Sequence, residues 1–544
     1  MSKRILYFAL AALMVVTLTL SACKPAVVTT EEPTEEKTAV EEPVGEEPTA
    51  EEPATEEPAE TRTTTKDTLI IGNINDVGNM DPYGVSAMQR ARVTGQIYET
   101  LFRENMDGSF SPLLATSWEW TDDTHLTVNL RQGVKFHNSD DFTAEDVLFT
   151  LNWAFNNQNW SSYFTKFDLT NTKAIDDYTV EFVLSSPDAM AMESLASFMP
   201  IVNDTTLNAD PAALTNIAVG TGPYKFVEWV TGDSVTLERF DGYWGEKPII
   251  KTVIFRSIPE VTQRSIELQT GGIDFAYDLG KTDVAGFEGN PDVAVYQNAG
   301  ACVHNIHFNA SEGHIFANED LRKAAVSAIS AADILKGAYD GGGWVANSYV
   351  SLAAPGFNTA LTSEPWPQDI EKAKEYFKAS GVAEGTQIKI IVDDRAYRIA
   401  TTEIIKNQLA QIGLDATIQQ YDFTTAYGYA QDVTNDWDIY PLAQCQPSAT
   451  AQAARLTNAV KYVTFPDTPA GADLLAMINE LLGTVDLAKA QDLNNQIQVY
   501  VNEHVVLYPV VQSEVLHGYN TQLQGVPEGM LSTTIIYCQN LYFK

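Results

Sequence analysis

The chain is long and strongly acidic. Its 544 residues include 34 lysines and arginines against 72 acidic residues, a net charge of −38. Such a chain lacks the basic face that nucleic-acid binding usually requires, so nucleic acid is excluded as a partner. Residues 67–544 alone carry −31. At 478 residues this body is far longer than a typical domain, which predicts at least two lobes with separate cores.

Residues 1–23 are predicted to be an export signal. Lys3 and Arg4 precede an almost uninterrupted apolar stretch at 5–20. That stretch is short for a membrane span of about 20 residues. The segment ends on LSAC at residues 20–23, which resembles the lipobox of bacterial lipoproteins and implies an acylated Cys23 as membrane anchor. An ordinary secretory peptide and a single membrane-spanning helix are the alternatives.

Residues 24–66 are predicted to be a disordered acidic tether. Glu-Glu-Pro recurs at 31–33, 41–43, 46–48, 51–53 and 56–58, and no apolar period is present. The segment carries a net charge of −9. Repulsion between these charges and the prolines favour an extended stalk over a packed structure.

A compact series of elements follows between residues 112 and 147. Apolar and polar residues alternate over 126–130, which predicts a half-buried strand. Gly133 permits a turn, after which residues 134–137 are expected to return antiparallel. Thr143 begins a capping-box pattern, so a helix should start there with Val147, Leu148 and Leu151 on its apolar face.

The residues in this stretch also carry a family resemblance. The runs at 112–119, 130–137 and 142–147 closely resemble the family 5 extracellular solute-binding proteins, the peptide, nickel and oligosaccharide receptors of ABC importers. Further matches extend the resemblance to essentially all of 67–544. One is YETLF at 98–102, which is expected to lie on a helix. The others are GTGPY at 220–224 and the runs at 237–245, 305–309, 321–329 and 505–511. The GTGPY block and the run after it are interpreted as scaffold.

The resemblance implies an α/β, two-lobe periplasmic-binding-protein-like fold of type II, in its large cluster. Lobe I would comprise 67–310 plus 512–544, with an inserted subdomain at about 112–228. Lobe II would comprise 311–511, and the chain would cross between lobes near 300–312 and 505–515. In lobe II a strand at 388–392, a helix lined by Ile405, Leu409 and Ile412, and a strand at 416–420 predict a parallel sheet.

Neither catalytic nor metal-binding motifs stand out, and no enzyme activity or cofactor is expected. GKT at 280–282 lacks the upstream glycine of a phosphate-binding loop. His304 and His307 would face opposite sides of a strand, so they should not share a metal. The three cysteines after the signal are Cys302, Cys445 and Cys538. They can form one disulfide at most, and the sequence does not indicate which two would pair.

The ligand site is expected in a cleft between the lobes, where aromatic and a few polar side chains converge. The richest stretch is 393–444, mostly in predicted loops after strands. The candidate ligand-binding residues are Arg395, Tyr397, Tyr421, Tyr427, Trp437, Tyr440 and Gln444, with Trp344 and Tyr349 as weaker candidates.

One departure from the family bears on the ligand. In the best-known peptide receptors a stretch like 437–444 is soon followed by an aspartate that pairs with the peptide's α-ammonium. Residues 445–450 of this chain contain no acid. Asp393 or Asp394 would then substitute, because a buried ammonium without a carboxylate is costly, or the ligand has no amine there.

The expected function is therefore a lipid-anchored, monomeric substrate-binding protein on the outer face of the bacterial cytoplasmic membrane, at the cell surface or in the periplasm. It would deliver a solute, first of all an oligopeptide, to an ABC permease, with membrane lipid holding the acylated cysteine. An oligosaccharide receptor of the same family is the first alternative, because sugars bind by aromatic stacking and neutral hydrogen bonds. A surface adhesin or sensor on the same fold is the second.

Overall fold

A computed structural model describes residues 63–84, 88–457, 469–527 and 535–544. The predicted signal peptide, Cys23 and almost all of the predicted tether lie outside these residues. The strands are β1 (Thr68–Asn73), β2 (Phe102–Glu104), β3 (Phe110–Pro112), β4 (Ala115–Asp122), β5 (His125–Leu130), β6 (Lys173–Asp176), β7 (Thr179–Val183), β8 (Tyr224–Val230), β9 (Ser234–Arg239), β10 (Thr252–Ser257), β11 (Phe275–Ala276), β12 (Val293–Phe308), β13 (Trp344–Val345), β14 (Thr386–Val392), β15 (Leu414–Gln420), β16 (Ile439–Cys445), β17 (Leu507–Asn520), β18 (Leu523–Gln524) and β19 (Tyr542–Phe543).

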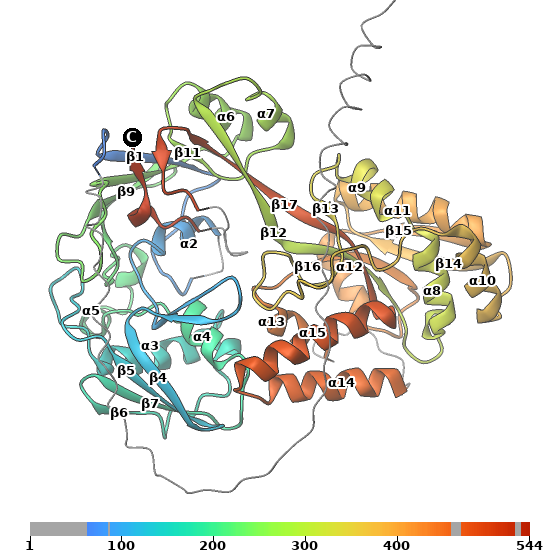
Figure 1. Cartoon of the computed structure of the whole chain (residues 1–544), viewed down its shortest axis with the longest axis horizontal. Helices are drawn as coiled ribbons and strands as arrows, with labels where there is room; N and C mark the ends of the chain where they lie inside the picture. Colours follow the sequence, from blue (N-terminus) through green and yellow to red (C-terminus); the bar gives the residue numbers. More distant parts are fainter. Residues whose placement is uncertain (1–62, 85–87, 458–468, 528–534) are drawn as a thin grey trace, which may run out of the picture. The chain divides into compact units, whose positions relative to one another are not determined.

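Helices alternate with these strands, most densely after residue 310 (Figure 1). The α-helices are α2 (Met88–Thr94), α3 (Ala144–Asn156), α4 (Ala191–Ser197), α5 (Asp204–Ala209), α6 (Val261–Gln269), α7 (Lys281–Ala285), α8 (Glu319–Ala328), α9 (Ala331–Ala338), α10 (Ile370–Ser380), α11 (Ala396–Leu409), α12 (Phe423–Ala430), α13 (Ala449–Ala454), α14 (Pro469–Leu482) and α15 (Leu487–Glu503). Short 3₁₀ turns are η1 (Ser161–Tyr163), η2 (Ala213–Thr215), η3 (Ile315–Ala317), η4 (Ala410–Ile412) and η5 (Cys538–Asn540).

The main sheet runs in the order β15-β14-β16-β12-β17-β11-β1-β10-β9-β8, and β13 also pairs with β17. At its centre the long strands β12 and β17 lie antiparallel, and Figure 1 shows them side by side. At one end β14 and β15 are parallel and joined through α11, as the sequence predicted. The two long strands therefore connect the parallel α/β end to the strands nearer the chain start.

Buried hydrophobic side chains form four clusters rather than one. The largest draws on residues 69–296 and 523–543, two others lie within 306–511, and a small one packs around α6. Several cores agree with the expectation of more than one lobe. The boundaries at 310/311 and 511/512, and the subdomain at 112–228, stay predictions.

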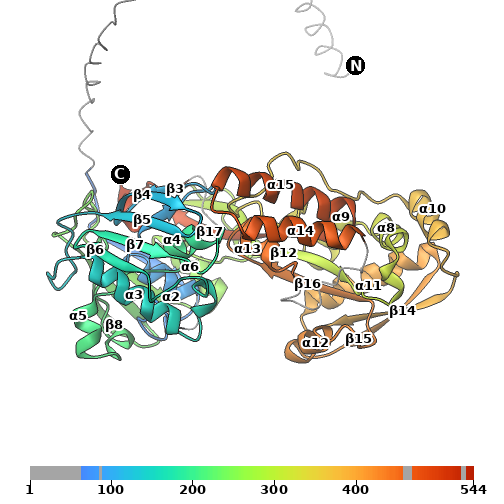
Figure 2. The ribbon, with the colours of Figure 1, turned by 90° about the horizontal axis from the view of Figure 1, so that it is seen from below.

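A separate four-stranded sheet, β4-β5-β7-β6, contains the strand expected at 126–130, and Figure 2 shows α3 beside it. Leu126, Val128 and Leu130 are buried in it. The expected capping box at the start of α3 is also present, because the Thr143 N–H donates to Asp146 Oδ2 at 3.0 Å.

The expected hairpin partner at 134–137 is wrong. β5 pairs instead with β4 and β7, and Asp122 closes the β4–β5 turn by accepting from the Thr124 and His125 N–H groups at 2.7 and 2.9 Å. Residues 134–137 form no strand. The His137 N–H donates to Gly220 O at 2.9 Å, so this backbone is used by the GTGPY segment.

The helix expected over 98–102 is also wrong. Helix α2 ends at Thr94, and the chain then extends into β2. Hydrogen bonds from distant segments stabilise this extended backbone. The Gly222 N–H donates to Ile97 O at 2.8 Å, and the buried Glu99 carboxylate accepts from the Thr221 and Tyr243 hydroxyls, both at 2.8 Å. These contacts support the interpretation of GTGPY and the following run as scaffold.

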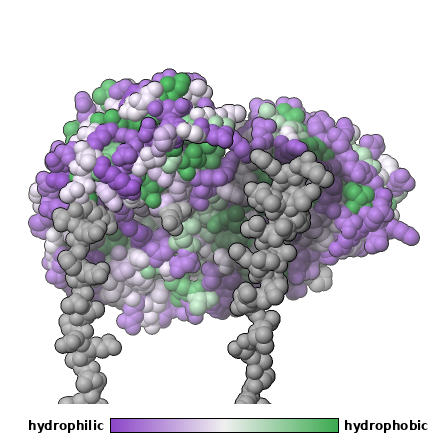
Figure 3. All heavy atoms as spheres, turned by 45° about the horizontal axis from the view of Figure 1, so that its top comes forward, coloured by the Kyte–Doolittle hydropathy of each residue, from purple (hydrophilic) through white to green (hydrophobic). Residues whose placement is uncertain are grey.

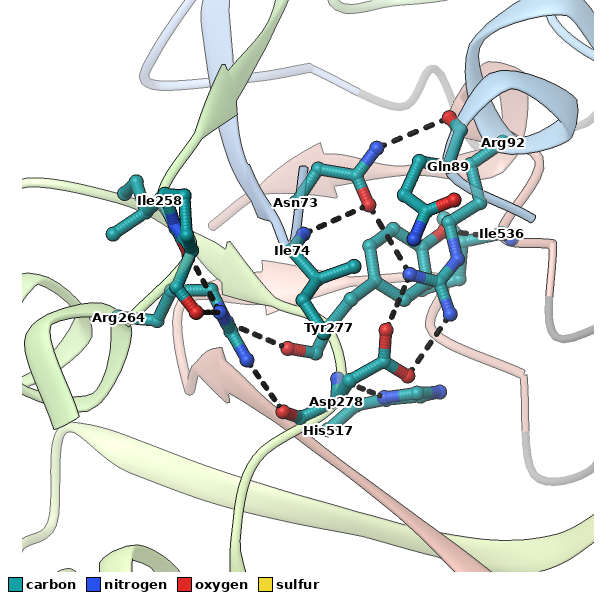
Figure 4. A network of polar contacts seen from close by, with 11 residues as sticks. Asn73, Ile74, Gln89, Arg92, Ile258, Arg264, Tyr277, Asp278, His517 and Ile536 are labelled. Atoms are coloured by element: carbon teal, nitrogen blue, oxygen red, sulfur yellow. Dashed lines mark hydrogen bonds and ion pairs between the residues drawn. The ribbon is translucent and has the colours of Figure 1, made fainter. Parts of the chain in front are cut away.

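A buried polar network holds β1, α2, β11 and β17 together (Figure 4). The Arg92 guanidinium donates to both oxygens of Asp278, at 2.6 and 3.0 Å, and stacks on the Tyr277 ring. Arg264 donates to the backbone carbonyls of residues 258, 259, 277 and 278. His517, on the central strand β17, accepts from the Asp278 N–H at 3.1 Å. The network anchors the end of β17 that pairs with β11.

Most of the surface visible in Figure 3 is hydrophilic, as the charge of the chain leads one to expect. Among the described residues there is no helix that is both long and apolar enough for a membrane crossing.

Candidate functional site

The larger of two cavities in the region of the predicted site holds about 750 Å³ and is named here the arginine cavity. Its walls come from the starts of α11 and α12, the end of α9, and the ends of β16 and α13. Its lining residues are Cys302, His304, Ala338, Tyr339, Asp340, Arg395, Tyr397, Arg398, Phe423, Tyr427, Leu442, Ala443, Gln444, Cys445, Gln446, Arg455 and Ser513.

A buried ion pair builds one wall of the arginine cavity. Asp393 has no exposed surface, and its carboxylate pairs with Arg398 and lies 3.6 Å from Arg395. The Arg395 guanidinium stacks over the Phe423 ring at 4.3 Å and remains 40% exposed. Since Asp393 is already shared by two arginines, it is unsuited to pair with a ligand's ammonium.

Two positive charges act on His304 in this cavity. Burial, and then the charges of Arg398 and Arg395, lower the pKa of His304 to about 3. Gln444 contributes a donor, because its buried Nε2 makes no hydrogen bond within the described chain while its Oε1 accepts from Gln452 Nε2 at 2.6 Å. Cationic and amide donors beside aromatic rings suit a carboxylate ligand group.

A disulfide between Cys302 and Cys445 also lines this cavity. The two cysteines are directly opposite on β12 and β16. Cys538 is a buried free thiol. The one disulfide that the sequence allowed therefore ties the central strand to the end of β16, beside Gln444.

The second cavity holds about 210 Å³ and is named here the acidic cavity. Two carboxyl groups and many aromatic rings line it. Its lining residues are Pro82, Ala91, Thr94, Gly95, Tyr98, Glu99, Thr100, Phe102, Arg103, Glu104, Leu113, Trp160, Ala196, Ser197, Phe198, Pro200, Pro223, Pro355, Pro447, Ile535, Tyr537 and Gln539. Pro355 and Pro447 come from the predicted lobe II and the rest from the predicted lobe I.

The carboxyls at this cavity differ in how they are held. Glu99 accepts from Thr221, Tyr243 and Trp244 at 2.8–2.9 Å, which marks it as structural. Glu104 accepts only from Ser197 Oγ, at 2.9 Å, within the described residues, and burial raises its pKa to about 7. Glu99 and Glu104 thus line the same cavity, but Glu104 has more unused hydrogen-bond acceptor capacity for a ligand than Glu99.

Four of the nine predicted ligand residues meet in the arginine cavity. They are Arg395, Tyr397, Tyr427 and Gln444. Trp344 is 36% exposed on β13, and Tyr421 stacks on Tyr429; neither lines the cavity.

Trp437, Tyr440 and Tyr349 have at most 1% exposed surface and pack in one hydrophobic cluster. Side chains without exposed surface have no face for a ligand in this conformation, so these three residues belong to the core. Composition marked 393–444 as aromatic, but it could not tell which rings point inward to the core.

Several residues at the cavities escaped the sequence reasoning. Tyr339 and Arg455 line the arginine cavity from outside the stretch 393–444, and Arg398 follows Asp393 by five residues, across the start of α11. Glu104 lies in a strand that the sequence did not predict. The spacing of Asp393 and Arg398 is a signal that could have been used; the others meet only through long-range folding.

Among the described residues no group of three or more histidine, cysteine or acidic side chains could hold a metal ion. His304 lines the arginine cavity while His307, three residues along β12, is buried.

The comparison with known families decides the class of protein. The model for bacterial extracellular solute-binding proteins, family 5, matches residues 109–457. The chain belongs to this family. Members of this family are extracellular or periplasmic substrate-binding proteins of ABC transporters, not enzymes.

Relatives and solved structures agree with this assignment. The glutathione-binding protein GsiB of Pectobacterium atrosepticum is 28% identical over 355 residues, which cover 63% of this chain and 67% of that protein. The structure of HbpA2 from Haemophilus parasuis has a TM-score of 0.79 at 21% identity, over 88% of this chain and all of that one. A nickel ABC transporter structure from Bacillus halodurans has a TM-score of 0.74 at 21% identity, with the same coverage. The fold is thus the two-lobe, periplasmic-binding-protein-like α/β fold expected from the sequence.

Proposed function

We propose that the chain is a lipid-anchored receptor that captures an oligopeptide between its two lobes and delivers it to a membrane permease. The observation that carries the choice of ligand is the arginine cavity. Three arginines, aromatic rings and an unused amide donor converge on about 750 Å³ in a chain whose overall charge is −38. Arginine binds carboxylates through its planar set of donors, so the cavity suits a carboxylate-bearing solute.

The ligands named for two related proteins support a carboxylate-bearing solute. The relative from Pectobacterium atrosepticum is described as glutathione-binding, and a structural neighbour from Helicobacter pylori, 22% identical with a TM-score of 0.66, was solved with the peptide STSA. Both ligands carry carboxylates. An oligosaccharide is the second candidate, favoured by Tyr339, Tyr397 and Phe423 in the same cavity, because aromatic rings stack on sugars.

Capture is proposed to proceed by hinge closure about β12 and β17. These strands connect the two ends of the main sheet, and a ligand that binds the closed form better shifts the population toward it. Small-angle scattering should then show compaction when a tight ligand is added, and an unchanged radius of gyration would count against the hinge.

Native mass spectrometry of the full chain, purified from cells grown in rich medium, tests the ligand directly. We expect bound masses that match short peptides and that are released on denaturation. Masses spaced by hexose units would favour the oligosaccharide receptor. The anchor is tested separately, since Cys23→Ser should move the protein from the membrane fraction to the soluble fraction without changing ligand binding.

A further inference from the structure

A further carboxyl group, that of Glu193, is buried near Glu104 and does not itself line the acidic cavity. Helix α4 packs against β2, which brings Glu193 close enough to Glu104 for their charges to interact. Glu193 is 4% exposed. Its Oε2 accepts from the Ser448 hydroxyl at 2.6 Å, and its Oε1 is buried with no hydrogen-bond partner in the described residues.

The half-buried Glu104 and the buried Glu193 both have few hydrogen-bond partners. In the described chain each accepts from one serine hydroxyl, and neither takes part in an ion pair. A carboxylate can accept about four hydrogen bonds, so most of their capacity is unused. Burial, and then the charge of Glu104, raise the pKa of Glu193 to about 8. Both groups would be stabilised by a cation.

The surrounding charges leave room for such a cation. Asp188 adds negative potential at Glu193, while the charges of both Glu193 and Arg455 act on Tyr163. Arg103 lines the same cavity but stacks over Tyr537 at 4.9 Å and acts on Glu99. Lys166 is engaged with Pro187 O at 3.0 Å. Trp160 and Phe198 supply the ring faces that commonly accompany an ammonium group.

The acidic cavity also adjoins the arginine cavity through one short segment. Gln444 and Gln446 line the arginine cavity, Pro447 lines the acidic cavity, and Ser448 bonds to Glu193. A solute that spans residues 444–448 would therefore place one end near arginines and the other near carboxyls.

We propose that Glu104 and Glu193 form a subsite for a primary ammonium group of the captured solute, on the predicted lobe I. This inference rests on the proposed function and deepens it, because it makes the solute a zwitterion. It also supplies the acid that residues 445–450 lack. The ammonium is the N-terminus of a peptide or a lysine side chain, and the test separates the two.

Calorimetric titration of the full chain with tetraalanine and with N-acetyl-tetraalanine is the test. We expect acetylation to weaken binding at least about tenfold, the range of one charge-assisted contact. In Glu104→Gln and Glu193→Gln the two peptides should bind within about twofold of each other, since Gln removes the charge but can still accept from Ser197 or Ser448. Glu228→Gln, an exposed carboxyl on β8, is the matched control and should behave like the unaltered chain.

Proton release provides a readout that a merely structural role would not change. Glu104 and Glu193 hold a proton near neutral pH in the empty protein, so an arriving ammonium should expel it. Titrations at pH 7 in phosphate and in Tris should show release with tetraalanine and none with its acetylated form. Release should be smaller in Glu193→Gln, where only Glu104 can still give up a proton, even if that variant binds weakly.

The source of the ammonium is distinguished by N-acetyl-Ala-Ala-Ala-Lys. If this peptide binds about tenfold tighter than N-acetyl-tetraalanine, and N-acetylation of lysine peptides costs little, the lysine side chain is the occupant. Equal binding of all peptides by the unaltered chain, without proton release, would overturn the subsite and leave the proposed function standing. Binding of none of them would instead overturn the proposed function.

Discussion

The two cavities hold their charges in opposite ways. In the arginine cavity the buried Asp393 carboxylate lies between Arg395 and Arg398, and a disulfide fixes the adjacent strands. At the acidic cavity Glu104, and Glu193 buried near it, accept only from serine hydroxyls within the described residues, and their pKa values are raised. One wall is thus pre-organised by ion pairing, whereas the raised pKa values at the other favour the protonated form of its carboxyls. The difference suits a solute with a carboxylate at one end and an ammonium at the other.

The largest effect should come from removing the disulfide beside the arginine cavity. It closes a loop with a sequence separation of 143, and the chain-entropy argument gives about 4–5 kcal/mol for loops of this length. Cys302→Ser combined with Cys445→Ser should lower the free energy of unfolding by roughly that amount in urea titrations. Cys538→Ala, which removes a buried free thiol, should cost only about 1 kcal/mol. Equal losses would show that the disulfide does not stabilise the fold by closing this loop.

The acidic cavity should make stability depend on pH. The folded-state pKa of Glu193, about 8, lies above its ordinary value of 4.5, so the folded protein binds more protons between these values. Stability is therefore greatest at low pH within this window and falls as pH rises through 8, by on the order of 4 kcal/mol. Glu193→Gln should lose much less between pH 5 and 9 in thermal or urea unfolding. Parallel pH profiles of the two proteins would contradict a protonated Glu193.

A smaller loss is expected from breaking the buried ion pair of the arginine cavity. Asp393→Ala leaves Arg398, 4% exposed, without its carboxylate, which should cost about 3 kcal/mol of stability. The neighbouring Asp394→Ala is the control, because Asp394 is exposed and should change stability by less than about 0.5 kcal/mol. Similar effects of the two substitutions would show that Asp393 does not organise this wall.

The smallest effect should be on binding alone. Arg455 is exposed at the edge of the arginine cavity and, within the described residues, forms no ion pair with a carboxylate, unlike Arg395 and Arg398. Arg455→Ala should weaken tetraalanine about tenfold and its C-terminal amide hardly at all. Lys378→Ala, an exposed cation on α10, should change neither. A similar loss for acid and amide would place the carboxylate elsewhere.

Local patterns explain which parts of the fold could be predicted. The alternation in β5 and the capping box of α3 depend on neighbouring residues, and both are present. Residues 134–137 and 98–102 have strand-like and helix-like patterns, but distant backbone groups take their hydrogen bonds: Gly220 O accepts from the His137 N–H, and Glu99 O accepts from the Ile201 N–H. There the long-range contacts override the local signal.

The residues at the cavities also divide into those that the local sequence could predict and those that it could not. Arg395, Tyr397, Tyr427 and Gln444 could be found because they lie close in sequence near strand ends. Trp437 and Tyr440 have the same composition signal but point into a core. Glu193 and Ser448 are 255 residues apart, so nothing in either local sequence indicates their contact.

Binding of one peptide in four chemical forms tests the central claim most directly. Tetraalanine with both ends free, with its amine acetylated, with its carboxylate amidated, and with both ends blocked would be titrated into the unaltered full chain. We expect the free peptide to bind tightest, each single block to weaken it about tenfold, and the double block to weaken it about a hundredfold. Equal affinity for all four forms would contradict a receptor that reads a zwitterion between an acidic and an arginine cavity.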